Sequence, residues 1–170
     1  MPNSHLMSES IAYTAGASRA TIYQELLPQI QAVIAPEADL MANLANVAAI
    51  LKEAFGFFWV GFYRRIDDEL VLGPFQGPLA CTRIVLDRGV CGAAATRQET
   101  VLVPDVEQFP GHIACSSASR SEIVVPLVTL GRTELVLDID SDQVDDFSPV
   151  DQQHLEAIVR LLAEQHYRLP

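Results

Sequence analysis

Two segments near the start of the chain carry apolar residues at a helical spacing. In 18–34 and again in 39–55, apolar side chains recur every three or four positions, which predicts two amphipathic helices. Pro36 lies between them and separates the two patterns. Asp39 is suited to cap the start of the second helix, and Gly56 is suited to end it.

The hydrophobic pattern then changes to one that is typical of strands. Residues 57–64 and 69–75 are rich in aromatic and β-branched side chains, and the acidic pair between them favours a hairpin turn. Two Gly-Pro pairs, at 73–74 and 77–78, mark a loop after the hairpin. Three more strands are predicted at 100–103, 122–130 and 132–139.

A short helix, a long loop and a final helix complete the predicted elements. Residues 90–97 form the short, alanine-rich helix, and the last helix begins at Pro149 with Ser148 as its cap and runs to about Tyr167. We interpret 104–121 as a functional loop, because it is long and rich in serine. Strands follow one another more often than they alternate with helices, which predicts an α+β fold with a mainly antiparallel sheet.

The domain organisation is simple. The 170 residues suit one domain with a proper core, and no repeat or linker divides them. The opening six residues are typical of an expression leader, so we expect one domain over 7–170. No apolar run approaches the length of a membrane span.

Charge and cysteine count narrow the choice of partners. The formal charge of −11, without any Lys/Arg cluster, disfavours nucleic acid and anionic membranes as partners, whereas it favours a cationic group such as an ammonium. The three cysteines and the lack of a secretory leader favour a reducing compartment, so we expect the protein in the cytoplasm.

The cysteines are the first candidates for chemistry. Cys115 lies in the serine-rich loop three residues after His112, and a nearby imidazolium would favour its reactive thiolate form. Cys81 is also loop-like, so the two thiols could meet and form a disulfide, with one sulfur attacking and the other resolving the product. Cys91, at the start of the short helix, is either a second resolving thiol or a packed side chain.

Carboxylates and aromatic residues form a second candidate set. Asp138 and Asp140 share a face if their strand continues, and Glu122 opens the neighbouring strand. Three clustered carboxylates would bind an ammonium and raise one another's pKa, so that one could stay protonated and act as an acid. Trp59 and Tyr63 share a face of one strand, either as an aromatic wall for a methyl-sulfur group or as core.

Other chemistries fit these residues less well. Zinc would need more ligands than His112 and Cys115, and no Cys-x-x-Cys motif supplies them. The acidic run 138–142 lacks the glycine and glutamate of a calcium loop, and the cation that phosphoryl chemistry needs is far away. A cysteine hydrolase lacks an evident third orienting group. We therefore expect neither a bound metal nor a cofactor.

Six short motifs between Trp59 and Ser141 occur together. They lie at 73–81, 89–92, 103–106, 109–115, 119–126 and 137–141. As a set they resemble the free methionine-(R)-sulfoxide reductases, which are built on a GAF domain, and the Phe-Pro-Gly-His-Ile-Ala-Cys run that ends at Cys115 is the most specific of them. The resemblance implies a GAF-like fold, with helices packed on one face of the sheet and a loop-covered ligand pocket on the other.

The resemblance also implies roles for these residues. Cys115 would attack the sulfoxide sulfur of free methionine sulfoxide, and Cys81, or alternatively Cys91, would then form a disulfide that thioredoxin or a similar reductant reduces. The three carboxylates would hold the substrate and assist departure of its oxygen, and the aromatic pair would surround the methyl-sulfur end. A homodimer through the helices is expected as well. The alternative is a non-catalytic GAF module that binds a small ligand or senses redox state.

Two positions depart from the family pattern. Ser116 stands where the family usually has aspartate, which removes a negative neighbour of the thiolate and any contact that the aspartate makes. Glu134 stands where a glycine is usual, which predicts a change in the hairpin turn or in local packing. Neither position changes the cysteines or the three carboxylates.

Overall fold

The computed structural model describes residues 10–167, so the expected leader at 1–6 lies outside the described residues. Over the described range the chain forms four α-helices, six strands and one short 3-10 helix, η1. The elements are α1 (Arg19–Ile34), α2 (Leu40–Phe55), β1 (Trp59–Ile66), β2 (Glu69–Gln76), β3 (Arg83–Val85), α3 (Gly89–Arg97), β4 (Val101–Val103), η1 (Val106–Gln108), β5 (Ser121–Thr129), β6 (Arg132–Ser141) and α4 (Pro149–His166).

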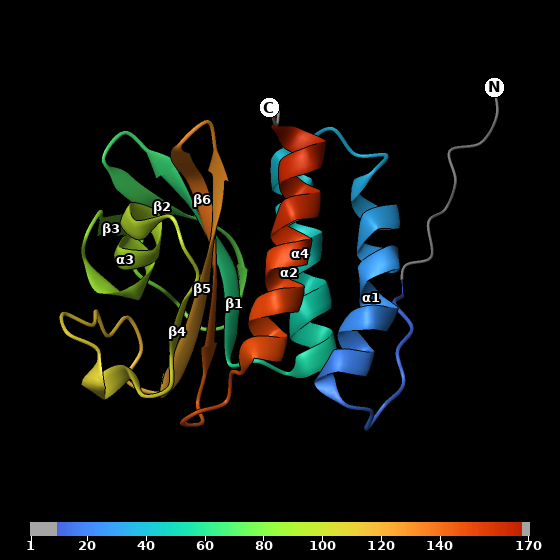
Figure 1. Ribbon diagram of the computed structural model, residues 1–170, viewed down its shortest axis with the longest axis horizontal. Helices are drawn as coiled ribbons and strands as arrows, with labels where there is room; N and C mark the ends of the chain where they lie inside the picture. The colour runs from blue at the N-terminus through green and yellow to red at the C-terminus, as the bar shows by residue number, and fades with distance from the viewer. Residues whose placement is uncertain (1–9, 168–170) are drawn as a thin grey trace.

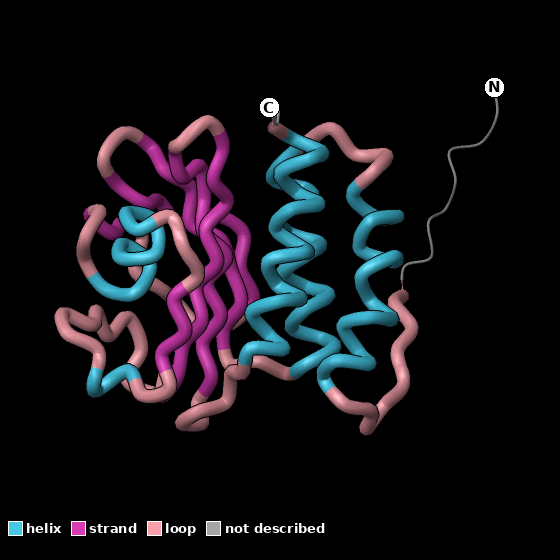
Figure 2. Tube along the Cα trace, viewed as in Figure 1, coloured by secondary structure: helices cyan, strands magenta, loops and turns pink. Residues whose placement is uncertain are grey.

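The six strands form one antiparallel sheet in the order β3-β2-β1-β6-β5-β4. Helices α1, α2 and α4 lie together on one side of this sheet, and α3 lies on the other (Figure 1). Loops cover much of the side that carries α3 (Figure 2). The α+β class and the mainly antiparallel sheet are confirmed, and the short helix α3 shares its side of the sheet with the loops.

The helix ends follow from side chains that cap backbone groups. The Asp39 carboxylate accepts a hydrogen bond from the backbone of Ala42 at the start of α2. Gly56 ends the same helix in the left-handed conformation, with φ 65°, which glycine adopts without a steric penalty. At the start of α4, Ser148 and Asp151 form a reciprocal capping box. The predicted helix boundaries therefore hold to within one residue at these ends.

Alternation along the central strands divides the molecule into two apolar clusters. On β5, Ile123, Val125 and Leu127 pack into the larger cluster, between the sheet and the three long helices. Val124 faces the other way, into a smaller cluster beneath α3. Period-two alternation thus places every second residue of β5 on the face away from the helix layer. No helix in the described part is long and apolar enough to cross a membrane.

Two parts of the predicted secondary structure are wrong. β3 (Arg83–Val85) was not predicted, because a three-residue strand with only its central residue buried shows too little alternation to be recognised. The Gly73-Pro74 pair lies inside β2, at a register shift where Gly61 pairs with Phe75 but Tyr63 pairs with Leu72. The irregular pairing there accommodates a Gly-Pro pair that would disrupt a regular ladder.

Candidate active site

The register of the central strands brings the three candidate carboxylates together. Glu122 on β5 lies opposite Asp140 on β6, and Asp140 in turn lies opposite Trp59 on β1. Asp138 occupies the next position on the same face of β6, opposite Gly61. Side chains that lie directly opposite one another point to the same face of a sheet. A patch of carboxylates beside an indole therefore lies on the face away from the long helices.

Burial favours the protonated form of these carboxyl groups. Glu122 and Asp138 are only 5% and 6% exposed. Burial, and then repulsion from Asp140, raises the pKa of both groups well above the ordinary carboxylate range. Burial also raises the pKa of Asp140, to about 6, against the opposing effects of a hydrogen bond from Ser119 and the nearby His112. The cluster can therefore supply a proton near neutral pH.

The aromatic pair on β1 connects the sheet to the loop that carries Cys81. Trp59 and Tyr63 have ring centroids 5.9 Å apart, and Trp59 also stacks on Phe75 at 5.3 Å. The indole nitrogen of Trp59 donates to the carbonyl oxygen of Pro78 over 3.1 Å, and the Tyr63 hydroxyl donates to the carbonyl oxygen of Cys81 over 2.9 Å. Both rings are thus packed as core residues, and both also line the cavity described below.

Gly61 leaves room for the indole of Trp59. A Cβ atom at Gly61 would lie 2.3 Å from Cη2 of Trp59 and 2.5 Å from Cβ of Phe75. We expect Gly61→Ala to displace the indole and to lower the free energy of unfolding by about 1–3 kcal/mol, as overpacking does. We also expect KM for the substrate to rise. Urea denaturation and steady-state kinetics measure the two effects.

A control separates backbone strain from loss of the aromatic wall. Gly131 has φ 74°, and a Cβ atom there would meet nothing within 4 Å. Gly131→Ala should therefore cost stability, by about 1 kcal/mol, through its backbone conformation and leave KM unchanged. Equal KM values for Gly61→Ala and the wild-type protein would contradict a role for Trp59 in binding.

The cysteines divide into a bonded pair and one buried thiol. Cys81 and Cys115 are 34 residues apart in sequence and form a disulfide with a Cα–Cα distance of 5.4 Å. Cys91 is free and only 3% exposed, at the start of α3. Burial, and then the nearby Asp138, raises the pKa of the Cys91 thiol. Of the two cysteines that the sequence left open as partners of Cys115, the structure pairs Cys81.

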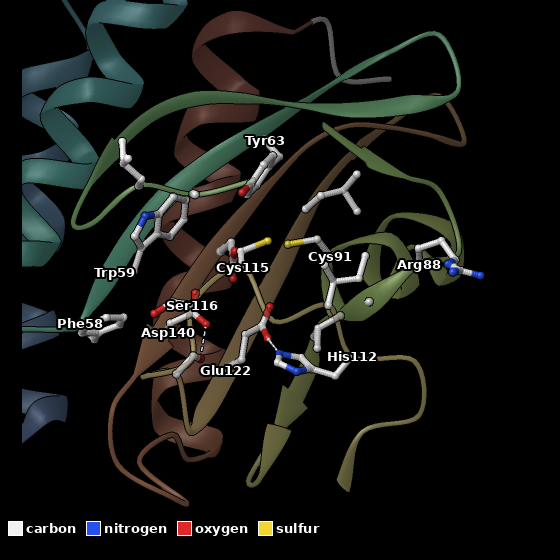
Figure 3. A pocket seen from close by; sticks show the side chains of 18 residues that line it. Phe58, Trp59, Tyr63, Arg88, Cys91, His112, Cys115, Ser116, Glu122 and Asp140 are labelled. Atoms are coloured by element: carbon white, nitrogen blue, oxygen red, sulfur yellow. Dashed lines mark hydrogen bonds and ion pairs between the residues drawn. The ribbon is translucent and has the colours of Figure 1, made fainter. Parts of the chain in front are cut away.

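These residues surround one cavity between the sheet, α3 and the 104–120 loop (Figure 3). Its walls include Trp59, Tyr63, Cys91, Cys115 and the three carboxylates Glu122, Asp138 and Asp140. Cys81 does not line the cavity itself, but the disulfide joins it to Cys115, which does. A cysteine of the disulfide, the three carboxylates and the two aromatic rings therefore line one partly open cavity.

Sequence reasoning missed two contacts in this cavity. His112 was considered as a neighbour of the Cys115 thiolate and as a metal ligand, yet its Nε2 atom lies 3.7 Å from a carboxylate oxygen of Glu122 (Figure 3). Ser119 was not singled out, yet its hydroxyl donates to the Asp140 carboxylate. Both residues lie within motifs that carry the family resemblance, at 109–115 and 119–126, but nothing in the sequence indicated their contacts with the carboxylates. The zinc pair considered from sequence, His112 and Cys115, is not available, because Cys115 is in the disulfide.

The two departures from the family pattern have local partners. The Ser116 hydroxyl accepts a hydrogen bond from the backbone of Ala118 over 3.2 Å, and Ser116 lines the cavity. Glu134 lies in β6 and accepts a hydrogen bond from the Thr129 hydroxyl, also over 3.2 Å. The pairing of β5 with β6 shifts register between Leu127 and Val128, which leaves Glu134 without a partner on β5, and Leu130 and Gly131 both have positive φ in the turn.

The antiparallel sheet, with long helices on one face and a cavity on the other, defines a GAF domain with a cysteine pair beside its cavity. Comparison with known families agrees, because the sequence profile described as "GAF domain" matches residues 37–164. GAF domain-containing protein A of Dictyostelium discoideum is 54% identical over 157 residues, which cover 92% of this chain and 99% of that protein.

Two further relatives have more specific names. Free methionine-R-sulfoxide reductase of Escherichia coli is 44% identical, over 89% of this chain and 94% of its own length. The crystal structure of free methionine-R-sulfoxide reductase from Neisseria meningitidis in complex with its substrate superimposes with a TM-score of 0.89 at 54% identity, over 92% of this chain and 94% of that one. This chain therefore belongs to the free methionine-R-sulfoxide reductase family of GAF-domain proteins.

Proposed function

We propose that this protein reduces free L-methionine-(R)-sulfoxide to L-methionine, with Cys115 as the nucleophile. The observation that carries the proposal is the Cys81–Cys115 disulfide at a cavity lined by two buried carboxylates, Glu122 and Asp138, and the half-buried Asp140. A thiol pair supplies the two electrons that a sulfoxide needs, and a protonated carboxylate supplies the acid. Two of the relatives named above, from Escherichia coli and Neisseria meningitidis, carry this activity in their names, and each matches about nine-tenths of this chain.

Reduction of one sulfoxide is balanced by oxidation of two thiols to one disulfide. The Cys115 thiolate bonds to the sulfoxide sulfur while a carboxylic acid of the cluster protonates the sulfoxide oxygen. The oxygen passes to Cys115, so that methionine leaves and a sulfenic acid remains. The Cys81 thiol then attacks the sulfenic sulfur, releasing water and forming the disulfide. One sulfoxide thus consumes two thiols and yields methionine, water and one disulfide.

The other cavity residues hold the substrate. Glu122, Asp138 and Asp140 share protons, so that one of them is protonated while the cluster as a whole keeps a negative charge. The negative charge attracts the ammonium of a free amino acid, and the protonated carboxyl assists departure of the oxygen. Trp59 and Tyr63 contact the methyl-sulfur end, where an aromatic face favours sulfur. The net charge of the whole chain, −11, also favours binding of a substrate that carries a cationic group.

Turnover requires an external reductant. Cys81 and Cys115 are both partly exposed, which supports access by thioredoxin or a similar dithiol. A reducing compartment, such as the cytoplasm, suits a disulfide that is reduced in every cycle. Dimerisation through the helices stays a prediction.

The first test is turnover by the wild-type protein. We expect methionine to form from the free R epimer in the presence of a thioredoxin system, with at least about 10²-fold lower kcat/KM for the S epimer. Chromatography of the amino-acid product measures both rates. A fully reduced protein that converts neither epimer would contradict the proposal and would favour the non-catalytic GAF module.

A further inference from the structure

One thiol in the cavity is not used by the proposed reaction. The Cys91 sulfur, one carboxylate oxygen of Glu122 and one of Asp138 all lie within 4.8 Å of one another. The three residues come from three elements, α3, β5 and β6, and all three are buried. The fold therefore holds a sulfur atom and two oxygen atoms close together without any contribution from the disulfide pair.

The pairing of Asp138 is incomplete. Its Oδ1 atom is buried and has no hydrogen-bond partner, although the residue is only 6% exposed and lines the cavity. Leaving a buried carboxylate oxygen unpaired is costly, and buried charged groups are ordinarily paired or bound to a metal. This unpaired oxygen, next to a thiol, indicates that the cluster is suited to a cationic ligand when the substrate is not bound.

The donor atoms select the cation. Thiolate sulfur is a poor ligand for Mg²⁺ and Ca²⁺, which prefer oxygen, whereas Zn²⁺ accepts sulfur, nitrogen and carboxylate oxygen in a tetrahedral site. Three protein ligands leave the fourth position of such an ion to a water molecule, as in zinc sites that keep an open position. The His112 ring lies beside Glu122, with Nε2 3.7 Å from Oε2 of that residue, but is not one of the three (Figure 3). This set differs from the one weighed from sequence, because it contains neither His112 nor Cys115.

We propose that this protein binds one Zn²⁺ ion through Cys91, Glu122 and Asp138, with a water molecule as the fourth ligand, and that the ion excludes the substrate from the cavity. Binding of the ion does not depend on the proposed function. Inhibition does depend on it, because the ion neutralises the carboxylates that would otherwise hold the substrate and donate a proton. Zinc then acts as a reversible inhibitor that competes with the sulfoxide.

The oxidised protein gives a clean test of binding, because its disulfide leaves Cys91 as the one free thiol among the three cysteines. Titration with Co²⁺ should produce a thiolate-to-cobalt charge-transfer band and the visible bands of a tetrahedral ion, which saturate at about one equivalent. Zn²⁺ should displace the cobalt and remove both sets of bands.

Three variants separate this site from loose binding elsewhere. Cys91→Ser should abolish the charge-transfer band, and Asp138→Asn should weaken Zn²⁺ binding at least about tenfold in equilibrium dialysis. Asp142→Asn changes an exposed carboxylate of the same segment and should bind as the wild type does. Circular dichroism and urea denaturation establish whether each variant is folded. If Cys91→Ser does not fold, Asp138→Asn still tests the site, because it keeps the shape of the side chain.

Each outcome is decisive for one part of the proposal. Absence of the cobalt band in wild-type protein, or unchanged Zn²⁺ affinity in folded Cys91→Ser or Asp138→Asn, overturns the site. Zinc that binds but leaves KM for the sulfoxide unchanged overturns the inhibitory role alone. If the protein shows no sulfoxide reduction at all, the cobalt spectra still decide whether the metal site exists.

Discussion

Cys115→Ser is expected to lower kcat/KM for free methionine-(R)-sulfoxide by at least about 10³-fold, because a serine hydroxyl is far less nucleophilic than a thiolate and forms no sulfenic acid. The structure places Cys115 at the cavity that holds the acidic cluster, and its bond to Cys81 places a second thiol within reach of any oxidised intermediate. The measurement is methionine release in the thioredoxin-coupled assay.

Cys81→Ser is the matched control, because it removes the resolving thiol and keeps the nucleophile. We expect this variant to release roughly one equivalent of methionine per chain in a rapid single turnover and then to stop with thioredoxin as reductant. Cys115→Ser should release none. A burst from Cys115→Ser together with no burst from Cys81→Ser would exchange the two roles.

Cys91 is an unsuitable first nucleophile for a physical reason. It is buried, and burial together with the nearby carboxylate of Asp138 raises the pKa of its thiol, so little thiolate forms near neutral pH. Cys115 lies on a partly exposed polar loop instead. Retention of a methionine burst by Cys91→Ser would agree with this assignment, and loss of the burst in a folded variant would contradict it.

Much of the fold could be predicted from the sequence because its signals are local. The helical spacing of apolar residues, the caps at Asp39 and Ser148 and the glycine at 56 each act within a few residues of the chain. The short strand β3 (Arg83–Val85) lacks such a signal, since its pairing with β2 is what makes it a strand. Likewise, the Gly73-Pro74 pair indicates a loop locally, and only the irregular pairing with β1 accommodates it within a strand.

The candidate site could be predicted in its residue types more than in its geometry. Alternation placed Asp138 and Asp140 on one face, but only the register of β5 against β6 puts Glu122 opposite Asp140. The contacts of Ser119 and His112 with the carboxylates depend on how the long loop folds back over the sheet, which no local pattern encodes. Gly61 is similar, because its missing side chain matters only once Trp59 lies across it.

The raised pKa values of the carboxylate cluster are expected to support activity but to lower folding stability. Buried carboxylates with raised pKa values bind protons more tightly in the folded chain than in the unfolded chain, so folding stability falls as the pH rises through those values. The folded Asp140 carboxyl has a pKa of about 6, compared with 3.8 for an unperturbed aspartate. That difference corresponds to a stability loss of at most about 3 kcal/mol, which develops between about pH 4 and pH 6 and is complete above it.

Asp140→Asn should therefore stabilise the protein while it lowers activity. An asparagine cannot ionise, and its side-chain oxygen still accepts the hydrogen bond from Ser119. We expect the free energy of unfolding at about pH 8 to rise by roughly 1–3 kcal/mol over the wild type, and the difference to vanish near pH 4, where the native aspartate is protonated as well. Urea denaturation at the two pH values measures this, and the reductase assay should show at least about a tenfold loss of kcat/KM.

The exposed Asp142 provides the comparison. Asp142→Asn removes one negative charge from the same segment without relieving burial, so its effect on unfolding should stay within about 0.5 kcal/mol at either pH. Equal stabilisation by both variants would show that the net charge of −11, rather than burial of Asp140, limits stability. Stabilisation by Asp140→Asn that persists at about pH 4 would contradict the raised pKa, because a protonated aspartate and an asparagine carry the same charge.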